Sequence, residues 1–173
     1  MQRPADNDYA HFYAGYVSLV PEDDVLSAIE QQSSETQRVI ASLDETRALH
    51  RYAEGKWSVK EVIGHVTDAE RVFGYRALCI ARGEKNSLPS FDEQVYMKNA
   101  NFDSWRIGDL AESYALVRRA NIVFFRNLDE AAWDRRGVAN NSEITVRALA
   151  FILAGHERHH LNVLRERYLI QAT

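Results

Sequence analysis

The chain has 173 residues, of which 46% are hydrophobic and 27% are charged, values that suit one soluble globular domain spanning residues 1–173. Its net charge is −4 with acidic and basic residues interspersed, so we expect no basic surface for nucleic acid, and no apolar run is long enough to span a membrane. A single cysteine, Cys79, excludes an internal disulfide and, with no signal-peptide pattern at the start, predicts a cytoplasmic location.

Residues 1–20 are rich in aromatic side chains and precede Pro21. This composition predicts an extended N-terminal arm that packs over a helical body. Apolar residues recur at helical spacing over residues 22–43, which predicts the first long helix. The polar residues 44–56 then predict a connection.

The second long helix has a clear start and end. Ser58 and Glu61 match a capping box, in which each side chain satisfies an unpaired backbone N–H of the other residue. Apolar residues continue at helical spacing to about Arg82, and Gly83 ends the helix. His65 lies on the inward face of this helix, about two turns from its start.

Residues 83–107 predict a long irregular connection between the second and third helices, with a short helix near residues 92–98. A segment of this length in a compact domain is usually a lid or a wall of a pocket. The remaining elements are expected in this order: a third long helix at about 108–127, one helical turn at 129–133, a loop at 135–143, and a last helix capped by Thr145. Four long helices without strand alternation predict an all-α four-helix bundle.

Three of the six histidines fall within five residues of the last helix. His156 and His160 are four residues apart, so their side chains lie one turn apart, about 6 Å along the axis, in line with an apolar stripe. Such a pair can bind one metal ion, or it can be two core histidines bonded to carboxylates or carbonyls. His65 is the natural third ligand, because bundle sites are built from facing helices.

The stretch from His156 to His160 also matches the H-E-x-x-H motif of zinc proteases, with Glu157 as the general base. Such proteases usually take their third ligand from downstream. Only thirteen residues follow His160, and their one acid, Glu166, points to another face of the helix. The third ligand is therefore expected upstream.

Several further motifs occur together along the chain. They are Lys56-Trp57-Ser58, Gly64-His65, Asp68, Glu70, Arg76, Phe91-Asp92-Glu93, Gly155-His156-Glu157-Arg158-His159-His160 and Arg165-Glu166-Arg167-Tyr168. With these residues, nearly the whole chain resembles the DinB-like superfamily of metal-binding four-helix bundles. The resemblance depends on Trp57-Ser58 with His65 and on the H-x-x-x-H pair taken together.

The resemblance implies that His65, His156 and His160 hold a divalent metal ion, zinc or nickel, and that His159 is a neighbour that does not bind it. It also implies a homodimer. Characterised relatives include thiol S-transferases and isomerases that use low-molecular-weight thiols such as bacillithiol or mycothiol, and others are called metal-dependent hydrolases. The implied function is a metal-dependent transferase or hydrolase that acts on a small-molecule substrate.

Three polar residues near the histidines have candidate roles. Asp68, three residues after His65, is expected either to accept the second ring N–H of that histidine or to be a solvated acid. Glu157 and His159 are the candidate catalytic residues. Glu157 could reach a water at the metal or be structural, and His159 could face the substrate and carry protons or be an ordinary polar residue.

Two classes of function remain open. An enzyme would leave a coordination position open toward a pocket lined by residues 84–107. A non-catalytic metal-binding or stress-response module would instead complete the site with a fourth protein ligand. The coordination of the metal therefore separates the two hypotheses.

Overall fold

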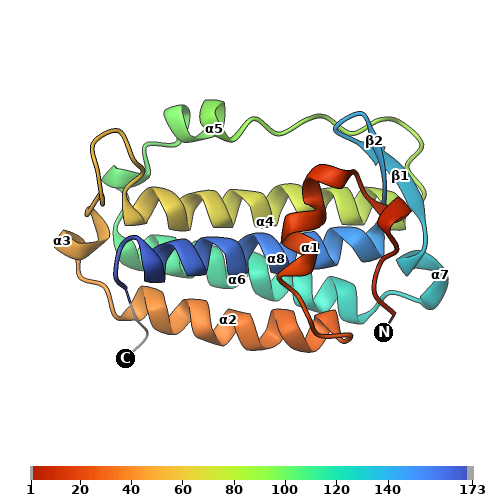
Figure 1. The fold of residues 1–173 in the computed structure, drawn as a ribbon, viewed down its shortest axis with the longest axis horizontal. Coiled ribbons are helices and arrows are strands. Elements are labelled where there is room, and N and C mark those ends of the chain that lie inside the picture. Colours follow the sequence, from red (N-terminus) through yellow and green to blue (C-terminus); the bar gives the residue numbers. More distant parts are fainter. Residues whose placement is uncertain (1, 171–173) are drawn as a thin grey trace.

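Four long helices form the body of the protein, whose computed structural model describes residues 2–170 (Figure 1). They are α2 (Val25–Ala41), α4 (Val59–Ala81), α6 (Ile107–Arg126) and α8 (Val146–Glu166). Both α2 and α4 pack against α6 and α8, so α2 and α4 stand at opposite corners of the bundle. The predicted all-α four-helix bundle is confirmed.

Side-chain caps set the helix ends. Ser58 and Glu61 form the predicted capping box of α4, and Gly83 follows that helix with a φ of +87°, which glycine tolerates. Thr145 caps α8 as predicted. The first long helix, α2, begins three residues later than predicted, because the Asp24 carboxylate caps it by accepting two backbone N–H groups.

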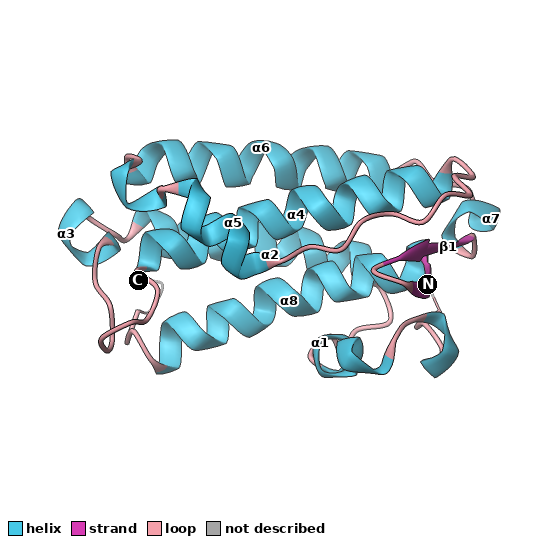
Figure 2. Cartoon of the chain, turned by 90° about the horizontal axis from the view of Figure 1, so that it is seen from above, coloured by secondary structure: helices cyan, strands magenta, loops and turns pink. Residues whose placement is uncertain are grey.

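The N-terminal residues form short helices instead of the predicted extended arm. Two 3₁₀ turns (Asp6–Asp8 and His11–Tyr13) lead into α1 (Ala14–Ser18), which crosses α8 (Figures 1 and 2). Val17 and Val20 are both buried in the core. Because these residues are three apart, a helical turn points both toward α8, whereas an extended arm would point them to opposite faces.

A small antiparallel hairpin replaces the loop expected at residues 135–143. It consists of β1 (Arg136–Ala139) and β2 (Ser142–Thr145), joined by Asn140 and Asn141. Both asparagines have positive φ, 52° and 59°, as a two-residue hairpin turn requires. Leu88 pairs with Ala139, so the hairpin also holds the connection that follows α4.

Short helices occupy the other connections. They are α3 (Glu45–Ala48), α5 (Glu93–Ala100), a 3₁₀ turn at Phe102–Ser104, and α7 (Glu130–Trp133). The short helix predicted near residues 92–98 and the helical turn predicted at 129–133 are confirmed by α5 and α7. Within residues 2–170, no helix is both long enough and apolar enough to cross a membrane.

A buried polar layer lies between two apolar clusters of the core. One cluster includes Ile29, Phe73 and Phe151, and the other includes Ile40, Ile63 and Leu161. The polar layer takes side chains from all four long helices: Gln32, Thr36, Glu70, Tyr114, Arg118 and Glu157. The layer lies at the same level along α8 as the candidate histidines.

Candidate metal centre

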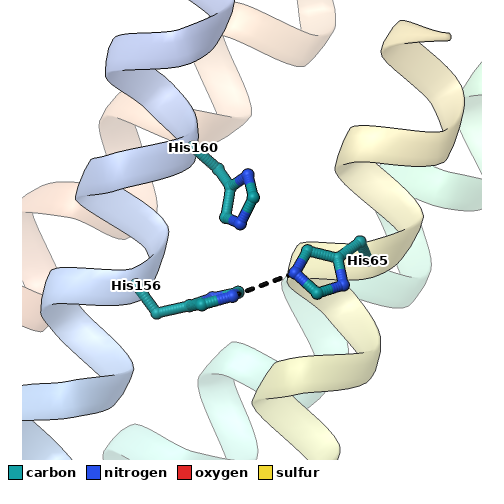
Figure 3. A group of neighbouring side chains, drawn as sticks. All are labelled: His65, His156 and His160. Atoms are coloured by element: carbon teal, nitrogen blue, oxygen red, sulfur yellow. Dashed lines mark hydrogen bonds between the residues drawn. The ribbon is translucent and has the colours of Figure 1, made fainter. Parts of the chain in front are cut away.

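Three histidines from two helices converge inside the bundle. His65 extends from α4, and His156 and His160 extend from α8 toward it (Figure 3). One ring nitrogen of each lies within 4.8 Å of the others, and His65 Nε2 is 3.0 Å from His156 Nε2. Among residues 2–170, the structure thus brings together the three predicted ligands in one group.

The separation of the His65 and His156 ring nitrogens suits two ligands of one metal ion. Two imidazole nitrogens bound to one zinc at about 2.0–2.1 Å each lie about 3.3 Å apart, close to the separation of His65 Nε2 and His156 Nε2. Unprotonated ring nitrogens that face each other repel unless a cation or a proton lies between them. The donor set therefore suits a divalent ion, and these three residues would hold it.

Burial keeps the three imidazoles in the form that binds metal. It lowers the pKa of His65 to about 4, with His159 adding a smaller effect, and it lowers the pKa of His156 and His160 well below the usual range. All three rings are therefore neutral at pH 7. Neutral imidazole is the metal-binding form, so protons compete weakly at this pH.

Aromatic rings enclose the histidines. Trp57 packs 4.9 Å from the His65 ring, and Phe73 and Tyr16 make edge contacts with His156 at 5.7 and 5.3 Å between ring centroids. Tyr16 belongs to α1, so the N-terminal segment forms part of the wall. These apolar rings lower the dielectric around the histidines, which strengthens electrostatic interactions at the site.

A cavity of about 190 Å³ adjoins the histidines. His65 and His156 both line it, as does Phe91 from the connection between α4 and α5. The prediction that residues 84–107 form a pocket wall therefore agrees with the position of Phe91. The remaining lining residues are Phe12, Tyr13, Tyr16, Phe73, Arg76, Glu93 and Asn140.

A sequence model of the DinB superfamily matches residues 28–164, which include all three histidines. The chain belongs to the DinB superfamily. The chain is 24% identical over 137 residues, 79% of each protein, to the Oceanobacillus iheyensis protein "Putative metal-dependent hydrolase OB0413".

Two solved structures share the fold of this DinB chain. YfiT from Bacillus subtilis, described as a probable metal-dependent hydrolase with an unusual four-helix bundle topology, superposes with a TM-score of 0.68 at 14% identity, covering 98% of this chain and 94% of its own. A mycothiol-dependent maleylpyruvate isomerase also gives a TM-score of 0.68 at 14% identity, covering 84% of this chain and 61% of the isomerase. At these identities the likeness shows the fold.

The candidate base Glu157 points into the polar layer of this DinB bundle. It is 1% exposed, and its carboxylate accepts hydrogen bonds from Thr36 Oγ1 at 2.7 Å, Arg118 Nη2 at 2.5 Å and Gln32 Nε2 at 3.1 Å. Tyr114 donates to it as well. All these donors come from α2 and α6, so of the two alternatives for Glu157 the geometry favours the structural one, and a catalytic role of Glu157 as the base of the zinc-protease motif stays an untested prediction.

The other two candidate side chains lie outside the ligand group. Asp68 accepts a hydrogen bond from Arg71 at 3.0 Å, and within residues 2–170 no hydrogen bond joins it to His65. The expectation that Asp68 orients that histidine is therefore not supported. His159 is exposed, with its ring 5.7 Å from that of Tyr16, so a role toward a substrate remains a prediction.

Sequence reasoning missed the polar layer that supports the site. Arg118 is fully buried, and its Nη2 lies 2.6 Å from Glu70 and 2.5 Å from Glu157. Its neighbour Tyr114, four residues earlier on the same inward stripe of α6, is the signal that could have placed Arg118 inside.

Gly155 allows α1 to approach His156 closely. A Cβ atom at this position would lie 1.9 Å from the backbone oxygen of Tyr16, a contact that only backbone movement can relieve. We expect Gly155→Ala to lower the free energy of unfolding by about 1–3 kcal/mol and to displace Tyr16 from the site. Gly108→Ala is the matched control, because a Cβ there meets nothing within 4 Å, and it should be neutral or stabilising by up to about 1 kcal/mol. If the two substitutions change the free energy of unfolding in urea equally, the close approach of α1 to Gly155 would be contradicted.

The metal-free protein should lose stability as the pH falls from about 6.5 to 4. Over this range the unfolded chain protonates His65, His156 and His160, while the folded chain keeps them neutral, so the unfolded state binds more protons. His65 alone accounts for roughly 3 kcal/mol. Burial raises the pKa of Glu70 to about 7, so over the same range the folded chain holds a proton on this carboxyl that the unfolded chain has lost. Glu70 therefore favours the folded state as the pH falls, but it is one group against three histidines.

Urea unfolding of chelated protein at several pH values measures this loss. His65→Ala removes one of the three titrating rings, so its stability should depend less steeply on pH than that of the wild type. If the free energy of unfolding depends on pH equally in the two proteins, the pKa of His65 would be the same in the folded and unfolded states.

Proposed function

We propose that this DinB protein is a metal-dependent enzyme in which His65, His156 and His160 hold a divalent ion, zinc or nickel, with one coordination position open to the cavity. The observation that carries this proposal is the cavity itself, which is lined by two of the three ligands. A metal with three histidine ligands and a pocket beside it is the arrangement of catalytic sites. No fourth ligand joins the group among residues 2–170, which argues against a purely structural module.

When bound, the ion supplies positive charge that lowers the pKa of a coordinated water or thiol. The residues of the chain hold the three imidazoles neutral, exclude water through aromatic packing and shape a pocket for a small molecule. Glu93 is the one carboxylate among the lining residues, and it lies at the exposed rim. Among the described residues, the cavity wall therefore has no buried carboxylate to act as a general base.

The missing base favours a thiol as the nucleophile. A thiol has an unperturbed pKa of about 8.5 and needs only the ion to become a thiolate, whereas proteases of the H-E-x-x-H type add a glutamate base for water. We therefore favour transfer of a low-molecular-weight thiol to an electrophilic carbon. Hydrolysis is the second candidate, supported by the hydrolase names of OB0413 and YfiT.

Reconstitution with zinc or nickel followed by paired assays tests this function. One assay follows thiol addition to 1-chloro-2,4-dinitrobenzene, in which the sulfur–carbon bond forms, chloride leaves and the thiol proton passes to solvent. The other follows hydrolysis of 4-nitrophenyl acetate. We expect metal-dependent thiol transfer that His65→Ala abolishes. Metal-dependent hydrolysis alone would select the second candidate, and no metal-dependent turnover with either would contradict an enzyme of these two classes.

Two further expectations accompany this function. The family resemblance predicts a homodimer, which sedimentation equilibrium would test. The single cysteine predicts a cytoplasmic location, which fractionation of cells would test.

A further inference from the structure

Arg76 is a buried cation without a counterion. It is 3% exposed, and its Nη2 donates to the Pro89 carbonyl at 2.7 Å. Among residues 2–170, no carboxylate oxygen lies within 4.0 Å of its guanidinium. The other two deeply buried cations are both paired, Arg118 with two glutamates and Lys60 with Glu45. An unpaired buried charge is costly, so the position of Arg76 needs another explanation.

Arg76 lines the same cavity as the histidines. It lies eleven residues after His65 on α4, three helical turns along, so both side chains extend from one face. The Arg76 guanidinium carbon is 5.9 Å from the Phe73 ring centroid, and that ring is 5.7 Å from the His156 ring. One aromatic ring therefore separates the free cation from the metal centre.

We infer that Arg76 binds an anionic group of the substrate, and that this group is a carboxylate on an apolar body. The inference rests on the proposed function, because it assumes that the other end of the same substrate molecule reacts at the three histidines. A guanidinium pairs with a carboxylate through two parallel hydrogen bonds, which fixes the orientation of the molecule in the cavity.

The composition of the cavity wall favours a single carboxylate over a phosphate. Among the described residues that line the cavity, Arg76 is the one arginine and five are Phe or Tyr. One cation neutralises one negative charge, whereas a phosphate would leave a second charge against aromatic rings. Glu93 at the rim disfavours further negative charge there. An aliphatic or aromatic monocarboxylate matches these surroundings.

Matched pairs of probes isolate the carboxylate. Zinc-loaded protein is titrated calorimetrically with ω-mercapto acids of three to eight carbons and with the corresponding ω-mercapto amides. The thiol of each probe is expected to bind the zinc ion. The two members of a pair differ only at the other end, where one has a charged carboxylate and the other a neutral amide. For the chain length that spans the cavity, we expect the acid to bind at least tenfold more tightly than the amide, since charged hydrogen bonds contribute about 1.5–3 kcal/mol.

Variants assign this preference to Arg76. In Arg76→Gln the acid and the amide should bind within about twofold of each other, while the zinc content stays at the wild-type value. Arg76→Lys keeps the positive charge but loses the planar guanidinium with its paired N–H donors, so it should retain part of the preference for the acid. This variant tests the inference if Arg76→Gln does not fold. Arg71→Gln is the control, because Arg71 lies on the same helix but pairs with Asp68, and it should keep the full preference. Glu93→Gln should increase the preference.

Failure of this inference differs from failure of the proposed function. If acid and amide bind equally to the wild type, or if Arg76→Gln keeps the preference, the anion site is overturned while thiol binding stands. If no thiol binds, the proposed nucleophile is wrong. NMR titration with hexanoate and hexanamide then measures binding at the anion site without the metal. A preference for hexanoate that is lost in Arg76→Gln would still support the anion site, whereas equal chemical-shift changes with the two compounds would overturn it.

Discussion

Glu157→Ala will lower the free energy of unfolding by about 3–5 kcal/mol, which corresponds to roughly 10 °C in melting temperature. The Glu157 carboxylate accepts hydrogen bonds from four side chains of α2 and α6, and it pairs with the fully buried Arg118. Alanine leaves those donors without their acceptor and opens a cavity between the two apolar clusters. Urea unfolding with metal bound and with metal removed measures the loss.

Glu166→Ala is the matched control, because Glu166 is an exposed glutamate of the same helix. It should change stability by less than about 0.5 kcal/mol. Glu157→Gln keeps the shape and part of the hydrogen bonding, so its loss should fall between those of the two alanine variants. A loss as small as that of Glu166→Ala would show that the polar layer does not depend on Glu157.

His65→Ala will weaken metal binding by more than about 100-fold, because it removes one of the three proposed protein ligands. Changes to groups that only support a ligand cost roughly 10–100-fold, so a larger loss distinguishes a ligand from a supporting residue. The bundle should stay folded without the metal, since its two apolar clusters do not depend on the ion. Competition with a chromophoric chelator gives the affinity, and circular dichroism confirms the helices.

His159→Ala is the control for this loss. His159 is exposed and lies outside the ligand group, so its removal should leave metal affinity within about threefold of the wild type. The zinc-protease interpretation assigns no role to His65. Wild-type affinity in His65→Ala would therefore favour that interpretation over the three-histidine site.

The features that sequence predicted are those with a local cause. The capping box of Ser58 and Glu61, the cap at Thr145 and the glycine after α4 are each set by neighbouring residues, and apolar stripes fix which face of each helix turns inward. That reasoning was enough to bring His65 near His156 and His160, because a ligand on an inward face of one helix must meet its partners on the facing helix.

The features that sequence did not predict depend on packing between distant segments. Glu157 lies one position from His156, and only the placement of α2 and α6 decides that its carboxylate meets Arg118 and Tyr114 instead of the three histidines. The close approach of Tyr16 to Gly155 likewise joins two segments that lie far apart along the chain. Local periodicity contains no information on such contacts.

X-ray absorption spectroscopy of the metal-loaded protein tests the three-histidine site most directly. With one equivalent of zinc bound, the spectrum should fit three imidazole nitrogens at about 2.0–2.1 Å and one further light atom, and an added thiol should replace that atom with sulfur at about 2.3 Å. His65→Ala should lose one imidazole from the fit or bind no zinc. Four protein ligands that no thiol displaces, or an unchanged spectrum in His65→Ala, would contradict a catalytic centre of His65, His156 and His160.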